Sequence, residues 1–341
     1  MAMLNKPISI EWDLSYNCNF SCIHCRNSAS TNIKFLPLSY YKSIIRKVSV
    51  LGAEFLTIGG GEPLLYPRIA ELIRYGSSLG FKCRILSNGW FITESLVEKL
   101  KANDLWGIMI SIDGIGKTHD RIRGVKGAFK RAVNAIKLLV RHKINVVVGM
   151  TLNSLNYKQI EEVIKLCHGL RVKNFGARPM IAIGRGCTNS ALDLSSLQHK
   201  QLLTEIYRLK QKYKNKISIK SGDPLFNILD KDRRIFAENR IMVFGGCDIG
   251  IATLRIDPCG NVTACPALPN LILGNIFKQN PKEIWQKNTT LELFRYKSQL
   301  QGKCGNCKFK YICGGCRARA NSNNNILGAD TKCWLNVIET A

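Results

Sequence analysis

Short apolar runs alternate with longer amphipathic stretches over the first 180 residues, and this alternation restricts the fold more than any other feature. Helical spacing of apolar residues suggests helices between strand-like runs, and Ser39 and Thr93 are suitable N-caps. Such repeats require a parallel sheet with right-handed crossovers. We therefore predict an α/β fold, a partial (β/α)6 barrel that stops short of the closed eight-stranded form. The predicted strands are 8–14, 54–59, 82–87, 105–112, 144–152 and 174–181, and the predicted helices are 39–52, 93–103, 127–142, 156–169 and 195–214.

The chain's 14 cysteines are unevenly distributed, with three in 18–25 and eight in 247–333. We expect a barrel over 1–215, a linker over 216–240 and a cysteine-rich domain over 241–341. The last part has too little apolar material for a core, so bound metal should hold it together. No apolar run is long enough to span a membrane, and the N-terminus lacks the features of a signal peptide. We expect a cytoplasmic protein whose clustered thiols bind metal.

The loops that follow the strands of such a barrel gather at one mouth and carry its reactive groups. The first loop contains Cys18, Cys22 and Cys25, while "GGGEP" (59–63), "SNG" (87–89) and "SIDG" (111–114) follow the next three strands. A CxxxCxxC loop can place three thiolates on three irons of a [4Fe–4S] core and leave the fourth iron open. A closed zinc site with His24 as the fourth ligand is the competing interpretation of these cysteines alone.

The three motifs together resemble the radical S-adenosylmethionine superfamily over about residues 8–185. This resemblance implies an enzyme that cleaves S-adenosylmethionine to a 5′-deoxyadenosyl radical, which abstracts hydrogen from a substrate. It implies that Cys18, Cys22 and Cys25 ligate the cluster and that His24 lies near the adenine. The residues expected to contact the cofactor are Gly60, Gly61, Glu62 and Pro63 at the methionine amino group, Ser111 and Asp113 at the ribose, Asn88 in the same ring of loops, and Arg123 at the methionine carboxylate or the substrate.

The C-terminal cysteines resemble the SPASM extension of that superfamily, which binds two auxiliary [4Fe–4S] clusters and brings the expected total to three. The resemblance assigns Cys247, Cys265 and Cys316 to one cluster and Cys304, Cys307, Cys313 and Cys333 to the other. Cys259 is a candidate fourth ligand of the first. The spacing in "CGGC" is one residue shorter than usual, and two zinc knuckles are the structural alternative. Cys83 and Cys167 have the surroundings of core residues, whereas Cys187, near the barrel mouth, is a candidate hydrogen donor to a substrate radical.

Enzymes with this extension commonly modify ribosomally made peptides, by crosslinking, thioether formation or epimerisation, and we expect a peptide substrate. Tetrapyrrole side-chain modification and sulfatase maturation are alternatives, although Pro266 stands where the sulfatase-maturing branch commonly has aspartate. A zinc-stapled basic protein that binds nucleic acid is the alternative outside enzymes. The net charge of +26 suits an acidic peptide leader or a carboxylate-rich tetrapyrrole. A flavodoxin or ferredoxin-type protein should donate electrons. Because only 17 residues precede Cys18, any leader should bind the barrel or a separate recognition protein.

Overall fold

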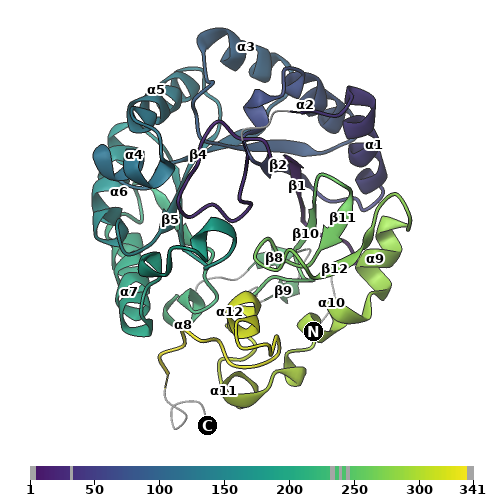
Figure 1. Ribbon diagram of the computed structural model, residues 1–341, viewed down its shortest axis with the longest axis vertical. Helices are drawn as coiled ribbons and strands as arrows, with labels where there is room; N and C mark the ends of the chain where they lie inside the picture. Colours follow the sequence, from purple (N-terminus) through teal and green to yellow (C-terminus); the bar gives the residue numbers. More distant parts are fainter. Residues whose placement is uncertain (1–4, 31–33, 231–234, 238–239, 243–245, 336–341) are drawn as a thin grey trace.

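Seven parallel strands, β1 to β7, form most of a barrel in the computed structural model (Figure 1). The structure describes residues 5–30, 34–230, 235–237, 240–242 and 246–335. The six predicted strands are all present, and β7 adds a seventh inside the segment expected to be a linker. The strands are β1 Ser9–Ser15, β2 Phe55–Gly60, β3 Lys82–Ser87, β4 Gly107–Ser111, β5 Val146–Leu152, β6 Asn174–Pro179 and β7 Ser218–Ser221.

Helices surround the outer face of these strands (Figure 1). In α1 the side chains of Tyr41, Ile44, Ile45 and Val48 are buried at three- and four-residue spacing, as expected of a helix with one face on a sheet. The predicted helices form, α7 with a capping box at Ser195. The helices of the barrel are α1 Leu38–Ser49, α2 Ile69–Ser78, α3 Glu94–Ala102, α4 Lys117–Arg123, α5 Ala128–Arg141, α6 Ile160–Gly169, α7 Ser196–Lys212 and α8 Phe226–Leu229.

The cysteine-rich region is joined to the barrel through the same sheet. Strand β10 (Thr253–Ile256) pairs in parallel with β1, and β11 (Asn261–Thr263) and β12 (Ile272–Asn275) extend it as antiparallel neighbours. The result is one ten-stranded sheet in the order β12-β11-β10-β1-β2-β3-β4-β5-β6-β7. A separate pair is formed by β8 (Ile235–Ala237) and β9 (Arg240–Met242).

The expectation that the C-terminal third lacks a core is wrong. Ile256, Trp285 and Phe294 are buried in the same apolar cluster as the barrel's Ile10 and Leu56. The apolar residues of this region are spread over several short elements that pack against the barrel. Because they share the core of the barrel, the low density of apolar residues along the sequence does not reveal how much apolar surface is buried. These elements are α9 Pro281–Lys287, α10 Thr289–Arg295, α11 Gly302–Gly305 and α12 Arg317–Asn321. None of the helices in the described ranges is long and apolar enough to cross a membrane.

Candidate active site and cysteine clusters

The loop after β1 carries the three N-terminal cysteines and is held by the end of β2. The N–H groups of Gly61 and Glu62 donate to the carbonyls of Ser15 and Asn17, both at 2.8 Å. A Cβ atom on Gly61 would lie 1.9 Å from the Asn17 oxygen, and one on Gly60 would lie 2.2 Å from the Ser15 oxygen. The two glycines are therefore required for the close approach of β2 to the cysteine loop, whatever they contact in a cofactor.

Cys18 and Cys22 are buried and Cys25 is half-buried. Burial raises the pKa of Cys18 to about 12 and also raises the pKa of Cys22, where the Arg123 guanidinium opposes the effect. Thiolates in such a site need added positive charge, which bound iron supplies, so the donor set fits a cluster. Among the described residues no three His, Cys, Asp or Glu side chains converge on one ion. A cubane does not need this convergence, because each thiolate binds a different iron.

Glu62 connects the second and third strand-end loops. Its buried carboxylate accepts hydrogen bonds from the Asn88 N–H at 2.7 Å, the Ser87 hydroxyl at 2.8 Å and the Leu64 N–H at 3.1 Å. Burial raises its pKa to about 7. The side-chain amide of Asn88 in turn donates to Asn19 in the cysteine loop at 2.9 Å. The carboxylate thus orders the loops that surround the cysteines, and its contact with the methionine amino group remains a prediction.

Asp113 and Arg123 form a buried ion pair at the mouth of the barrel, with 2.7 Å between Oδ2 and Nη2. Burial alone would raise the pKa of Asp113, but the Arg123 guanidinium, aided by its imidazole neighbours and a backbone hydrogen bond, holds it below its usual value. His24 Nε2 lies 3.3 Å from the same carboxylate, and burial lowers the pKa of this imidazole to about 4. Arg123 also reaches the Cys22 sulfur at 3.8 Å. Ser111, at the end of β4, is half-buried. The ribose and carboxylate contacts expected of these residues stay predictions.

Arg185 is a residue of this site that the sequence did not single out. It lies in the 3-10 turn Gly184–Gly186 and donates to the carbonyls of Cys22 at 2.9 Å and Ala29 at 2.8 Å. Its own N–H donates to the Cys25 carbonyl at 3.0 Å. The segment after β6 therefore packs on the cysteine loop, and Cys187 follows it with an exposed thiol. The sequence "GRG" at 184–186 indicates a turn at this position, but nothing in the sequence indicates that Arg185 contacts the cysteine loop.

Two further groups of cysteines form in the C-terminal region. Four of them line one cavity: Cys304, Cys307, Cys313 and Cys333. In the other group, burial raises the pKa of Cys265, and the thiols of Cys247 and Cys316 raise it further. These are the two sets of cysteines that the sequence predicted. Their roles as cluster ligands stay predictions.

Cys259 lies apart from both groups. It is exposed in the turn between β10 and β11, whereas Cys265 follows the far end of β11. An extended strand of the length of β11 separates its ends by roughly 10 Å. Cys259 instead lies near Tyr16 and Tyr40, and it contributes to the raised pKa values of both tyrosines. The structure therefore does not bring Cys259 together with Cys247, Cys265 and Cys316, and its expected role as the fourth ligand stays a prediction to be tested by substitution.

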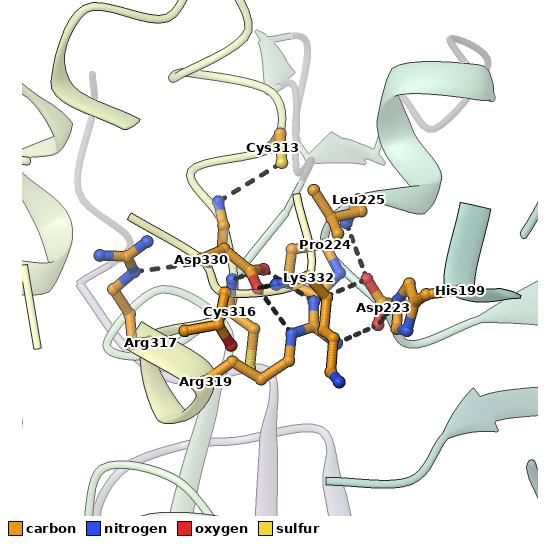
Figure 2. Close-up of polar contacts among 12 residues, drawn as sticks. His199, Asp223, Pro224, Leu225, Cys313, Cys316, Arg317, Arg319, Asp330 and Lys332 are labelled. Atoms are coloured by element: carbon orange, nitrogen blue, oxygen red, sulfur yellow. Dashed lines mark hydrogen bonds and ion pairs between the residues drawn. The ribbon is translucent and has the colours of Figure 1, made fainter. Parts of the chain in front are cut away.

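A buried ionic network connects the cysteine-rich region to the barrel (Figure 2). Arg319 in α12 donates to Asp223, which follows β7, at 2.6 and 3.1 Å and to Asp330 at 2.8 and 2.7 Å. Asp330 also accepts the N–H of Cys316 at 2.7 Å, and His199 of α7 lies 3.0 Å from Asp223. The network thereby fixes the backbone of one clustered cysteine relative to the barrel.

The comparisons with known proteins agree with this arrangement. A family model described as the radical SAM superfamily matches residues 12–167, and an iron–sulfur cluster-binding domain model, SPASM, matches residues 247–308. The AdoMet-dependent heme synthase of Methanosarcina barkeri is 30% identical over 330 residues, covering 94% of each chain. The mycofactocin maturase MftC of Mycolicibacterium smegmatis is 30% identical, with 92% of this chain and 79% of that protein covered.

The fold also matches a solved structure, that of Streptococcus suis SuiB bound to S-adenosylmethionine. The TM-score is 0.79 at 20% identity, over 98% of this chain and 78% of that one. Because a relative of 30% identity spans nearly the whole chain and the two family models fall on the barrel and on the cysteine-rich region, this protein belongs to the radical S-adenosylmethionine superfamily of enzymes and carries a C-terminal iron–sulfur cluster-binding domain.

Proposed function

We propose that the protein binds three [4Fe–4S] clusters and modifies a peptide by hydrogen abstraction. Cys18, Cys22 and Cys25 would hold the cluster that supplies an electron for the cleavage of S-adenosylmethionine. Cys247, Cys265 and Cys316 would hold one auxiliary cluster. The second would be held by Cys304, Cys307, Cys313 and Cys333. The observation that carries this proposal is that the thiols form three groups of buried or half-buried cysteines, one within a single loop and two that bring together more distant positions of the C-terminal region.

The chain's own residues would prepare the site for the cofactor. The buried pair of Asp113 and Arg123 fixes a positive charge beside Cys22. That charge suits thiolate ligands and the methionine carboxylate. Glu62, held by its three internal donors, would offer its carboxylate to the methionine amino group beside the backbone of Gly60 and Gly61. His24, neutral because of its burial, presents an uncharged ring at the mouth.

A peptide substrate is supported by relatives that are named as peptide maturases. These include mycofactocin maturase MftC and the sporulation killing factor maturation protein SkfB of Bacillus subtilis, which is 30% identical over 304 residues. SuiB, whose fold this chain shares, has been solved with the precursor peptide SuiA bound. We also propose a flavodoxin or ferredoxin-type electron donor and a cytoplasmic location, since a reducing compartment preserves such clusters.

A tetrapyrrole is the second candidate substrate, and the side chains inside the barrel favour a ligand with carboxylates. Arg178 on β6 faces the interior, is exposed there and has no hydrogen bond or ion pair to any described residue. Arg255 on β10 also faces inward and pairs with Asp13. An unpaired guanidinium is a ready partner for a carboxylate. The 94% mutual coverage with a heme synthase adds to this second candidate.

Iron and sulfide analysis after anaerobic reconstitution tests the cluster assignment, for which about twelve irons per chain are expected. Reduction with S-adenosylmethionine should release 5′-deoxyadenosine, and the triple variant Cys18→Ala, Cys22→Ala, Cys25→Ala should release none. Zinc without sulfide, or 5′-deoxyadenosine from the triple variant, would refute the proposal.

The substrate is decided by deuterium transfer into 5′-deoxyadenosine. Deuterated candidate precursor peptides and a deuterated tetrapyrrole with propionate side chains should be compared. Transfer from the peptide supports the first candidate, and transfer from the tetrapyrrole alone rejects it in favour of the second.

A further inference from the structure

Helix α12 directly follows Cys316 and carries two buried arginines. Arg317 is 0% exposed and Arg319 is 6% exposed. Burying a guanidinium is costly unless opposite charge and hydrogen-bond acceptors surround it. The partners of the two arginines therefore indicate which anions the fold provides for them.

Arg319 is fully balanced by protein groups. It lies between the carboxylates of Asp223 and Asp330, each of which accepts two of its hydrogen bonds (Figure 2). Two carboxylates around one guanidinium leave a net negative charge. Nothing further is needed to neutralise this arginine.

Arg317 is turned away from both carboxylates (Figure 2). It donates to the carbonyls of Ile326 at 3.0 Å and Gly328 at 2.8 Å, and its Nη2 lies 3.6 Å from the sulfur of Cys304. Within the described ranges no carboxylate is within ion-pair distance of it. Its positive charge faces the group of cysteines to which Cys304 belongs.

Two more cations adjoin that same group. Lys303 and Lys310 line the cavity formed by Cys304, Cys307, Cys313 and Cys333. Lys303 donates to the carbonyl of Cys333 at 3.4 Å, and Lys310 donates to that of Gly305 at 3.2 Å. Arg317, Lys303 and Lys310 bring three positive charges to this group, against the two carboxylates of Asp330 and Asp223 that act on Cys313.

The group of Cys247, Cys265 and Cys316 has a different charge balance. The Arg178 guanidinium interacts electrostatically with Cys265 and Cys316. It also interacts with the carboxylates of Glu11 and Asp248, which offset its positive charge. Arg319 is neutralised by its two aspartates. Lys297, which donates to the Cys247 carbonyl at 3.4 Å, and Asp330 each interact with cysteines of both groups and do not distinguish them, while Asp223 also acts on Cys313. The excess of positive charge therefore falls on the other group.

We propose that Arg317 is a positioning residue that makes the cluster at Cys304, Cys307, Cys313 and Cys333 the more easily reduced of the two auxiliary clusters. Positive charge and N–H···S hydrogen bonds both stabilise the added electron and raise the reduction potential. The electron comes from a flavodoxin-type donor in the cell or from dithionite in the assay. This inference rests on the ligand sets given under the proposed function.

The test is a redox titration followed by electron paramagnetic resonance, with dithionite as reductant. The anaerobically reconstituted Cys18→Ala, Cys22→Ala, Cys25→Ala variant retains only the auxiliary clusters and should contain about eight irons. Adding Cys307→Ala or Cys265→Ala assigns each signal to its group. The signal lost with Cys307→Ala should have the higher potential.

Arg317→Gln in the same background should lower that potential and leave the other unchanged, and Arg317→Lys should restore part of the shift. Arg295→Gln is the matched control, because Arg295 is also buried and donates to the carbonyls of Gly250 at 2.8 Å and Trp285 at 2.5 Å. It should move neither potential. Should the Arg317 variants fail to fold, Lys303→Gln, at a half-buried position, must still lower the same potential by a smaller amount.

The reverse order of potentials, equal shifts of both signals, or no shift in the Arg317 and Lys303 variants would overturn the inference. Clearly fewer than eight irons would instead refute the ligand assignment and the inference together. Eight irons with the wrong order refute only the inference.

Discussion

Replacing Arg319 by methionine should destabilise the protein strongly at neutral pH. The side chain is 6% exposed and bridges Asp223 and Asp330, which are 2% and 3% exposed. Removing one partner of a buried ion pair costs about 3–5 kcal/mol, because the remaining charge stays buried without compensation. Here two carboxylates lose their partner, so we expect at least the upper half of that range. The whole domain has only about 5–15 kcal/mol of stability.

The pKa of Asp223 also predicts how the difference in stability between the two proteins changes with pH. The Arg319 charge and the hydrogen bonds from Arg319 and His199 outweigh the effect of burial and hold the pKa of Asp223 well below its usual value. A depressed carboxyl pKa contributes stability that is present above the unfolded pKa, about 3.9, and is lost as the pH falls through the folded pKa. In the methionine variant the carboxylates have lost their cation and their pKa values rise. The difference in stability between the two proteins should therefore shrink as the pH falls from 7 to 5.

Anaerobic urea denaturation, followed by far-UV circular dichroism and by cluster absorbance together, measures this difference. Arg68→Met is the control, since Arg68 pairs at 2.6 Å with Glu71 in an exposed position and its loss should leave the midpoint unchanged. A loss below about 1 kcal/mol for Arg319→Met at pH 7 would refute the reasoning, because it would mean that the two aspartates are not left charged and buried. So would a difference that grows on acidification.

Three shorter predictions concern the loops and turns of the site. Gly61→Ala should cost the first cluster, seen as a loss of about four of twelve irons, because its Cβ would lie 1.9 Å from the Asn17 oxygen; full iron content would contradict this. Cys259→Ser should leave both auxiliary signals intact in resonance spectra, since Cys259 lies in an exposed turn, whereas Cys265→Ser should perturb one of them. Glu62→Gln should gain stability relative to the unmodified protein as the pH rises from about 4.5 to about 7, because the unfolded chain releases the Glu62 proton near 4.5 whereas burial keeps it bound in the folded protein up to about 7; parallel stability curves over this range would argue against it.

The strands and the loops after them could be predicted because both depend on local sequence. Short apolar runs between helical stretches identified β1 to β6 within a few residues of their bounds, and the strand ends then located Cys18, Glu62 and Asp113 at one mouth. The short strand β7 was missed because "SIKS" contains a single apolar residue, Ile219, and the strand is completed by pairing with β6.

Partners distant in sequence were beyond such reasoning. Nothing near Arg319 indicates that its carboxylates come from Asp223 and Asp330, and nothing near Arg185 indicates the carbonyl of Cys22. The position of Cys259 illustrates the same limit. The sequence made it a candidate fourth ligand, but it could not indicate that β11 lies between Cys259 and Cys265 in the fold.

The parallel pairing of β1 with β10 also has a consequence for how the protein is made. The strand that leads into the cysteine loop acquires its second neighbour only when the segment beginning at Thr253 has left the ribosome. At about 5–20 residues per second, β1 waits for tens of seconds with one edge unpaired. During that interval the edge and its apolar side chains are open to wrong pairing. Loading of iron before synthesis is complete would therefore take place on a barrel whose first strand is still exposed, which gives chaperones and cluster-assembly proteins a defined period in which to act.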